Sequence, residues 1–181
     1  MKGDQIKFLD IGIRYLLLAL ISLLGLSIFY FIFTPLTIYS SYFLLNLSFE
    51  VSLSGTIITI FSEGKIFPIE IIGACVAGSA YSLLAILNFS TPEIRLKQRI
   101  SMLLIAFISF FIINILRIFL LSLMFVSESA FFDVTHKLFW YAGSTLIVIG
   151  IWFTEVKLFK IRKIPFYSDI KYIYKKSRIK R

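Results

Sequence analysis

The chain has 181 residues, of which 59% are hydrophobic and only 16% are charged, and its formal net charge is +9. This composition excludes an ordinary soluble domain, which needs a polar shell, and it predicts an integral membrane protein. The one cysteine excludes an intrachain disulfide, and one cysteine with one histidine excludes a zinc site built from clusters of these residues. We therefore expect no metal and no cofactor.

The basic residues are concentrated after the last apolar stretch. Ten of the 19 Lys and Arg residues lie from Lys157 to the last residue of the sequence. A basic cluster beside a membrane span is explained by the positive-inside rule and by anionic lipid headgroups, so we expect the bilayer as a partner and no nucleic acid. The sequence thus predicts one transmembrane domain, residues 1–156, followed by a basic cytoplasmic tail, residues 157–181.

Four apolar stretches are long enough to cross a bilayer, which takes about 20 helical residues. We therefore expect an all-α integral membrane fold with spans at about 11–33, 71–89, 100–126 and 136–156. The first span is expected to end at Thr34-Pro35, because proline cannot continue the helical hydrogen-bond ladder. That stretch is too long for a signal peptide and lacks a small-residue cleavage site, so it is expected to remain as a helix.

The segment between the first two spans, residues 34–70, is expected to lie outside the cytoplasm. Residues 36–49 are apolar but interspersed with polar residues, which favours a helix along the membrane interface. Residues 51–54 and 67–71 alternate between apolar and polar on either side of a turn at 62–64. This pattern predicts a short β-hairpin, and Pro68 confines its strand to an edge.

The distribution of Lys and Arg near the span ends predicts the orientation. The loop at 88–99 has three of these residues, the segment at 34–72 has only Lys65, and the loop at 127–135 has none. By the positive-inside rule, both termini are predicted to be cytoplasmic. The chain is therefore expected to be a multi-pass protein of the cell membrane, with its hairpin region and its short acidic loop facing out.

Three chemically distinctive residues are predicted to share one level near the outer face. Cys75 falls in the first turns of the second span, and His136 opens the fourth, both at the outer end. Arg117 lies nine residues before the outer limit of the third span at Val126, roughly 13 Å deep at 1.5 Å per residue. Its long side chain can extend toward that surface. On this interpretation Arg117 is expected to be the one charge deep inside a span, because Arg14, Lys137 and Glu155 lie close to span ends.

Each of these residues has an ordinary explanation as well as a functional one. A single cysteine in a membrane helix is usually a small packing residue, and a histidine at a helix end is often an interfacial polar group. Arg117 is different, because a cation within a span costs about 2.5–3.5 kcal/mol and is functional by default. Asn114 lies one helical turn before Arg117 on the same face, where it can hold the guanidinium or line the same cavity.

Together the three residues favour acyl transfer on a peptide that arrives from outside. The reactive form of cysteine is the thiolate, which helix N-termini and nearby cations favour. His136 at a helix N-terminus suits the neutral imidazole that a general base requires. Arg117 can stabilise the oxyanion of a tetrahedral intermediate.

The residues and their order resemble the exosortase/archaeosortase family of membrane cysteine transpeptidases. The matching pieces are Ala74-Cys75 at the head of a span, Asn114-Ile115-Leu116-Arg117-Ile118 inside the next, His136 at the start of the following one, and the strand-like stretch from Leu53 to Ile60. They cover about residues 51–155.

The resemblance implies a sortase-like thiol protease and transpeptidase that acts in protein sorting. Such an enzyme cleaves the C-terminal sorting signal of secreted or surface proteins, holds the product as a thioester, and transfers it to an acceptor that can be lipid-linked. On this resemblance Cys75 would be the nucleophile, Arg117 the partner of the thiolate or transition state, and His136 the proton-transfer residue. Asn114 and Ser79 would support the site.

Two other classes of protein stay open from the sequence. One is a non-catalytic membrane assembly or binding subunit, in which Arg117 pairs with Glu70 or Glu128. Such a subunit should survive Cys75→Ala, whereas a cysteine enzyme should not. The other is a small transporter, which is disfavoured because Arg117 is the one charge expected deep inside a span and no paired broken helices are predicted.

Overall fold

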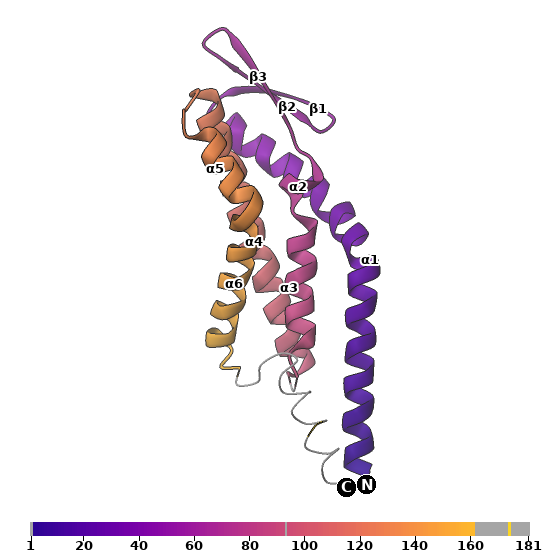
Figure 1. Ribbon diagram of the computed structural model, residues 1–181. Coiled ribbons are helices and arrows are strands. Elements are labelled where there is room, and N and C mark those ends of the chain that lie inside the picture. Colours follow the sequence, from indigo (N-terminus) through magenta and orange to yellow (C-terminus); the bar gives the residue numbers. More distant parts are fainter. Residues whose placement is uncertain (1, 93, 162–173, 175–181) are drawn as a thin grey trace.

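The computed structural model describes residues 2–92, 94–161 and 174 of the chain. Its helices are α1 (Lys2–Asn46), α2 (Gly73–Val76), α3 (Gly78–Ser90), α4 (Leu96–Val126), α5 (Phe132–Leu138), the π-helix η1 (Phe139–Gly143) and α6 (Ser144–Leu158). Its strands are β1 (Glu50–Ser54), β2 (Ile57–Ser62) and β3 (Lys65–Glu70). The helices form an elongated bundle that carries the sheet at one end (Figure 1). Apart from residues 157–161 and 174, the predicted basic tail lies outside the described residues.

Four segments of the described chain are long and apolar enough to cross a membrane. They are Leu24–Asn46, Gly73–Ser90, Leu96–Val126 and Phe132–Leu158. The prediction of a mostly helical chain with four helices able to cross a membrane is thereby confirmed, although the boundaries of the first of them differ.

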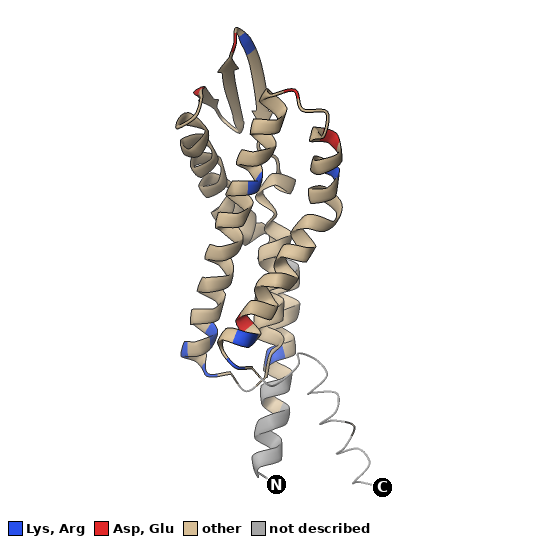
Figure 2. Cartoon of the chain, turned by 90° about the vertical axis from the view of Figure 1, so that its left-hand side faces the viewer, with Lys and Arg blue, Asp and Glu red and all other residues tan. Residues whose placement is uncertain are grey.

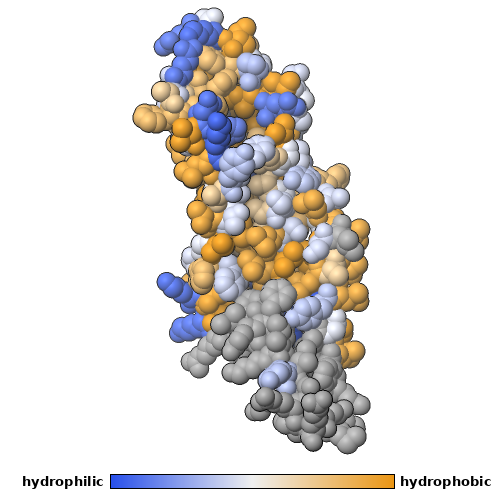
Figure 3. All heavy atoms as spheres, viewed as in Figure 1, coloured by the Kyte–Doolittle hydropathy of each residue, from blue (hydrophilic) through white to orange (hydrophobic). Residues whose placement is uncertain are grey.

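The bundle has an exterior that suits lipid. Hydrophobic residues cover much of its visible face, as Figure 3 shows in orange. On α4, apolar residues spaced by four positions each leave between 49% and 57% of their surface exposed: Leu104, Ile108, Ile112, Leu116 and Leu120. Residues at this spacing lie on one face of a helix. This face of α4 is therefore an apolar stripe of the kind that packs against acyl chains.

The helix expected to end at Thr34-Pro35 continues to Asn46, so that prediction is wrong. Proline removes one hydrogen bond from a helix interior and bends it, but packing can keep the helix intact on both sides. Here Ile38 and Leu45 are buried in the apolar cluster beneath the sheet, which holds the distal part of α1 in place. Figure 1 shows this part leaning over toward α5. The predicted interfacial helix is thus the last part of α1.

The predicted hairpin is an antiparallel sheet of three strands in the order β1-β2-β3. The turn was placed correctly, since Glu63 and Gly64 both have positive φ, of 51° and 75°, as a two-residue hairpin turn requires. The predicted hairpin did not include the central strand β2, although the stretch from Leu53 to Ile60 is strand-like in sequence. Its residues Ile58 and Ile60 are fully buried, while Phe61 on the opposite face is also apolar. An apolar residue on both faces removes the period-two alternation that would have revealed the strand.

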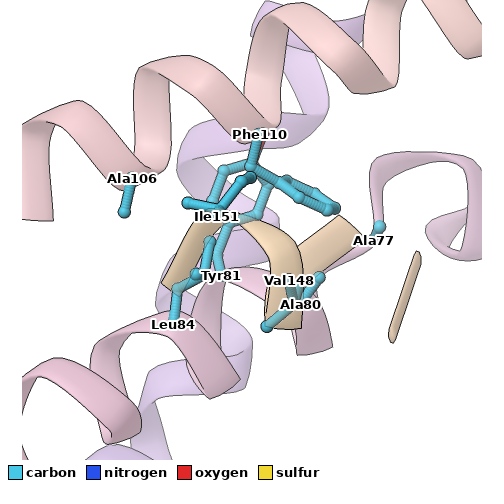
Figure 4. Packing of buried hydrophobic residues seen from close by; sticks show 8 residues of the cluster. All are labelled: Ala77, Ala80, Tyr81, Leu84, Ala106, Phe110, Val148 and Ile151. Carbon is cyan, nitrogen blue, oxygen red and sulfur yellow. The ribbon is translucent and has the colours of Figure 1, made fainter. Parts of the chain in front are cut away.

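Two apolar clusters hold the fold together. The first joins α3, α4 and α6 in the middle of the bundle, where Figure 4 shows Tyr81 among the buried side chains of the three helices. Phe33 of α1 stacks on Tyr81 with ring centroids 3.6 Å apart and so attaches α1 to the same cluster. The second cluster lies between the sheet, α1 and α4, and it includes Ile58, Ile60 and Ile118. It fixes the sheet over the end of the bundle.

Arg117 is not the only charged residue within a candidate span. Glu155 lies in α6, within the candidate span Phe132–Leu158, and exposes only 1% of its surface. Its Oε2 accepts a hydrogen bond of 3.1 Å from Nδ2 of Asn88 on α3. A polar pair between two helices satisfies groups that lipid could not. Glu155 therefore joins α3 to α6 at the end of the bundle opposite the sheet.

Candidate active site

A cavity of about 530 Å³ lies at the sheet end of the bundle. Its walls come from α1, β3, α2, α3, α4, α5, η1 and α6. Cys75, Arg117 and His136 all line it, together with Ser79. The structure therefore brings together three residues that are 42 and 19 positions apart in sequence order. Their chemical roles remain predictions.

Cys75 is held on a single turn of helix between the sheet and α3. The backbone N–H of Ile71 donates to the carbonyl of Thr56 at 2.9 Å, so the chain is still part of the sheet there. Two residues later α2 begins, and Cys75 donates its N–H to the carbonyl of Ile72 at 2.8 Å. The span is then interrupted at Ala77, which has a left-handed backbone with φ of 56°. Cys75 thus lies near a helix start, as predicted, but on a turn separate from α3.

Tyr30 of α1 packs against the backbone on both sides of Cys75, a contact that the sequence analysis did not anticipate. A Cβ at Gly78 would lie 2.9 Å from ring carbons of Tyr30, and a Cβ at Gly73 would lie 3.4 Å from the ring. The approach at Gly78 is closer than a Cβ permits without a shift, whereas the distance at Gly73 is an ordinary van der Waals contact. Tyr30 also lines the cavity. The two glycines flanking Cys75 were the available signal that some group packs closely here.

We expect Gly78→Ala to destabilise the protein by about 1–3 kcal/mol, the usual cost of inserting a methyl group into filled space. The new methyl group must displace the ring of Tyr30 or the backbone that follows Cys75. Thermal unfolding of the detergent-solubilised protein measures the effect. Gly150→Ala in α6 is the matched control, because nothing lies within 4 Å of a Cβ at Gly150. Equal midpoints for the two variants would contradict the tight contact.

Arg117 and Asn114 both reach the turn that carries Cys75. Nδ2 of Asn114 donates to the carbonyl oxygen of Cys75 at 2.8 Å. Nη2 of Arg117 lies 3.4 Å from the same oxygen and 3.5 Å from the carbonyl oxygen of Ala74, which are long hydrogen bonds. Nε of Arg117 is buried and has no hydrogen-bond partner among the described residues. The guanidinium thus has an unsatisfied donor and only long bonds from Nη2, while the residue lines the cavity.

Among the described residues, neither of the two acids considered as partners of Arg117 forms an ion pair with it. Glu128 accepts a hydrogen bond of 2.5 Å from Nζ of Lys65, and this bond raises the pKa of the Lys65 ammonium above its ordinary value. Within the described part of the chain, no carboxylate lies within ion-pair distance of Arg117, and Glu70 contributes only to the cavity wall. A structural ion pair is thus no explanation for Arg117 in the described residues.

His136 lies on α5, but it does not open that helix as predicted. The helix begins at Phe132, and Asp133 occupies its first turn, where a carboxylate is favourable. The polar residues of this turn were interpreted as a loop, although they are typical of a helix start. His136 therefore lies in the last turn of α5, and an argument from a helix N-terminus does not apply to it.

The histidine ring contacts aromatic neighbours on α5 and on η1, the π-helix that follows it. It stacks on Phe132 at a centroid distance of 5.5 Å and meets Trp140 edge-on at 6.0 Å. The π-helix η1 follows at Phe139, so both Phe139 and Trp140 face the cavity with His136. Insertions of this kind are frequent at functional sites. The ring is exposed, which leaves it free to exchange protons with a bound molecule.

The sheet is anchored beside the cavity by contacts with the end of α4. Lys65, next to the turn between β2 and β3, pairs with Glu128 in the loop after α4. Phe67 of β3 packs edge-to-face on Phe125 of α4, with centroids 5.6 Å apart. The charged pair is exposed and contributes little, so the aromatic contact carries most of the attachment. These contacts hold β3 against the cavity.

Comparison with known proteins adds no assignment to this site. No protein-family model, no curated protein and no solved structure matches the chain. The resemblance to exosortases and archaeosortases therefore rests on the short motifs around Cys75, Arg117 and His136. The function of the site has to be inferred from those motifs and from the geometry of the cavity.

Proposed function

We propose that this chain is a membrane-embedded cysteine transpeptidase of the exosortase/archaeosortase type. It would cleave the C-terminal sorting signal of secreted or surface proteins and transfer them to an acceptor, which can be lipid-linked. The observation that carries the proposal is the convergence of Cys75, Arg117 and His136 on one cavity from three separate helices. A nucleophile, a cation and a proton carrier are the groups that acyl transfer through a thioester requires.

The proposed reaction has two half-steps with balanced proton transfers. His136 accepts the proton of the Cys75 thiol, and the thiolate sulfur forms a bond to the carbonyl carbon of the scissile peptide. The C–N bond then breaks, and the protonated His136 gives its proton to the departing amine, which leaves a thioester. An acceptor nucleophile attacks the thioester, loses its proton to His136, and displaces the thiolate of Cys75. His136 then returns that proton to the thiolate, which restores the thiol and the neutral imidazole.

Arg117 suits the charge that develops in both half-steps. Each passes through a tetrahedral intermediate whose oxygen carries a negative charge, and preorganised donors stabilise such an oxyanion. Arg117 lines the cavity and holds its present main-chain acceptors only through long Nη2 contacts, so its guanidinium has N–H groups to offer an oxyanion, and it cannot lose its charge under ordinary conditions. Asn114 contributes by fixing the carbonyl of Cys75, so that the nucleophile and Arg117 keep their relative positions.

We further propose that the cavity faces the outside of the cell membrane and that both termini are cytoplasmic. Several of the described Lys and Arg residues gather at the end of the bundle opposite the sheet (Figure 2). Arg95 precedes α4 there, Lys97 and Arg99 lie in its first turn, and Lys157 lies in the last turn of α6. Basic residues accumulate on the cytoplasmic side of membrane proteins. The sheet end, with Cys75, would then face out.

Capture of the thioester tests the proposed function. The enzyme is co-expressed with a secreted protein that ends in a short motif, an apolar span and a basic cluster. We expect an adduct between the two proteins that survives denaturation without thiols and is released by neutral hydroxylamine, which cleaves thioesters. Gel mobility and mass spectrometry identify it and locate it on Cys75.

Two comparisons make this experiment decisive. Cys75→Ala should form no adduct while inserting into the membrane in the same amount, and a target without the apolar span should form none with the wild type. Normal sorting by Cys75→Ala would instead establish the non-catalytic assembly or binding subunit. An adduct that resists hydroxylamine would show that the bond is not a thioester.

A further inference from the structure

Strand β3 has one free edge, and its hydrogen-bonding groups can be assigned to one side or the other. β3 is an end strand of the sheet and pairs with β2 alone. In antiparallel pairs, residues alternate between those that bond to the partner and those whose N–H and C=O point away. The N–H of Ile71 donates to the carbonyl of Thr56, in the turn before β2. By this alternation, the main-chain groups of Ile69 and Phe67, two and four residues earlier, also point toward β2. The main-chain groups of Ile66, Pro68 and Glu70 therefore point outward.

Pro68 agrees with this assignment. Proline has no N–H, so it is tolerated in a sheet where that group would face away from the partner strand. The outward side thus offers the carbonyl of Pro68 and both the N–H and the carbonyl of Glu70. None of these groups has a hydrogen-bond partner elsewhere among the described residues.

The cavity with Cys75 lies against this free edge. Successive side chains of a strand point to opposite faces, so a cavity over one face would touch alternate residues only. Instead, the five successive residues from Pro68 to Ile72 all line the cavity. The opposite wall is apolar and includes Leu121 and Phe125 of α4 and Phe132 of α5. Unpaired main-chain groups on one side and apolar side chains on the other match an extended peptide.

We propose that the free edge of β3 binds an extended segment of the peptide substrate as a fourth strand of the sheet. This inference rests on the proposed function, for which it supplies the binding mode of the substrate. An added strand lies about 4.8 Å from its neighbour. Its main chain would bond to Pro68 and Glu70 and lead directly to Cys75, which lines the same cavity.

The proposed pairing also predicts what the site selects. Main-chain bonding gives affinity without reading sequence, and pockets for alternate side chains give specificity. Side chains of the substrate that face the helices would meet Leu121, Phe125 and Phe132, so we infer that alternate residues beside the scissile bond are apolar. Because Pro68 offers no donor, the substrate carbonyl opposite it remains free.

Photo-cross-linking tests the binding mode without requiring catalysis. In the Cys75→Ala protein, a benzophenone amino acid replaces Glu70 on β3 or, as the matched control, Ser54 on β1, the other end strand of the sheet. The probe is the co-expressed target with its motif, apolar span and basic cluster. We expect at least about tenfold more cross-linked target from position 70 than from position 54. Equal yields from the two edges would overturn the inference.

Two proline substitutions give a second test in the otherwise unaltered enzyme. Glu70→Pro removes an outward donor and should lower the rate of target processing at limiting substrate about two- to tenfold, the net value of one hydrogen bond. Pro68→Ala adds an outward donor and should raise it by a similar factor. Neither change affects a bond to β2, so both proteins should unfold at temperatures close to that of the wild type.

The results separate this inference from the proposed function. A wild type that forms the thioester, with processing unaffected by Glu70→Pro and Pro68→Ala, would refute strand addition and leave the transpeptidase in place. Strong cross-linking from position 70 without any thioester in the wild type would refute the transpeptidase and leave a peptide-binding edge. Opposite effects of the two proline changes, in the stated directions, support both.

Discussion

Cys75→Ser should lower the rate of target processing roughly 10³-fold or more. Serine is nearly the same size as cysteine but carries a hydroxyl group in place of the thiol. The proposed reaction needs an ionised nucleophile, and a hydroxyl ionises far less readily than a thiol. When catalytic residues act as a unit, removing the nucleophile alone loses most of the rate enhancement that all of them provide together. The measurement is the rate of tail removal, divided by the amount of variant enzyme found in the membrane.

The same experiment contains its own control for folding. Ser101→Ala changes an exposed hydroxyl at the far end of α4 and should process the target at the wild-type rate. Cys75→Ala should be as inactive as Cys75→Ser, since neither can form a thioester. Processing by either Cys75 variant within tenfold of the wild type would exclude the cysteine mechanism.

Much of the fold could be predicted because hydrophobic length is a local property. Four stretches of sufficient length gave four spans, and Gly64 marked a hairpin turn. Features that depend on tertiary packing could not be predicted in this way. Proline predicts the end of a helix only if nothing else holds the chain, and the burial of Ile38 and Leu45 keeps α1 continuous beyond Pro35. Likewise Glu155 lies one residue before the predicted end of the fourth span, and no local pattern indicates that it is buried and bonded to Asn88.

The candidate site was predictable in part for a similar reason. Helical rise converts positions along a span into depth, so Cys75, Arg117 and His136 could be placed at one level. The depth of a residue along its span does not reveal which helices face one another. That Tyr30 is the group packed against Gly73 and Gly78 depends on how α1 crosses α2 and α3, and no local pattern identifies it. The left-handed conformation of Ala77 also lacks a local signal, because alanine rarely adopts it.

Arg117→Lys should lower the turnover number of the enzyme by about 10²- to 10³-fold, the usual effect of removing one oxyanion donor. Lysine keeps the positive charge, but it concentrates its donors on one nitrogen at the end of a flexible chain. A guanidinium can bond to the carbonyl of Cys75 through Nη2 while its other N–H groups are left for another acceptor. An ammonium group at this position would have to exchange one contact for the other.

The kinetic pattern distinguishes this role from a structural one. With purified enzyme in liposomes and the tailed target as substrate, we expect kcat to fall and KM to change by less than about threefold, because the lost interaction forms only in the transition state. Arg99→Lys is the matched control on the same helix. Its guanidinium also donates to two main-chain carbonyls, those of Asn88 and Thr91, but at the end of α4 away from the cavity. If the two variants lose activity equally, or if Arg117→Lys loses activity only in proportion to the protein missing from the membrane, then Arg117 stabilises the helix packing and takes no part in the reaction.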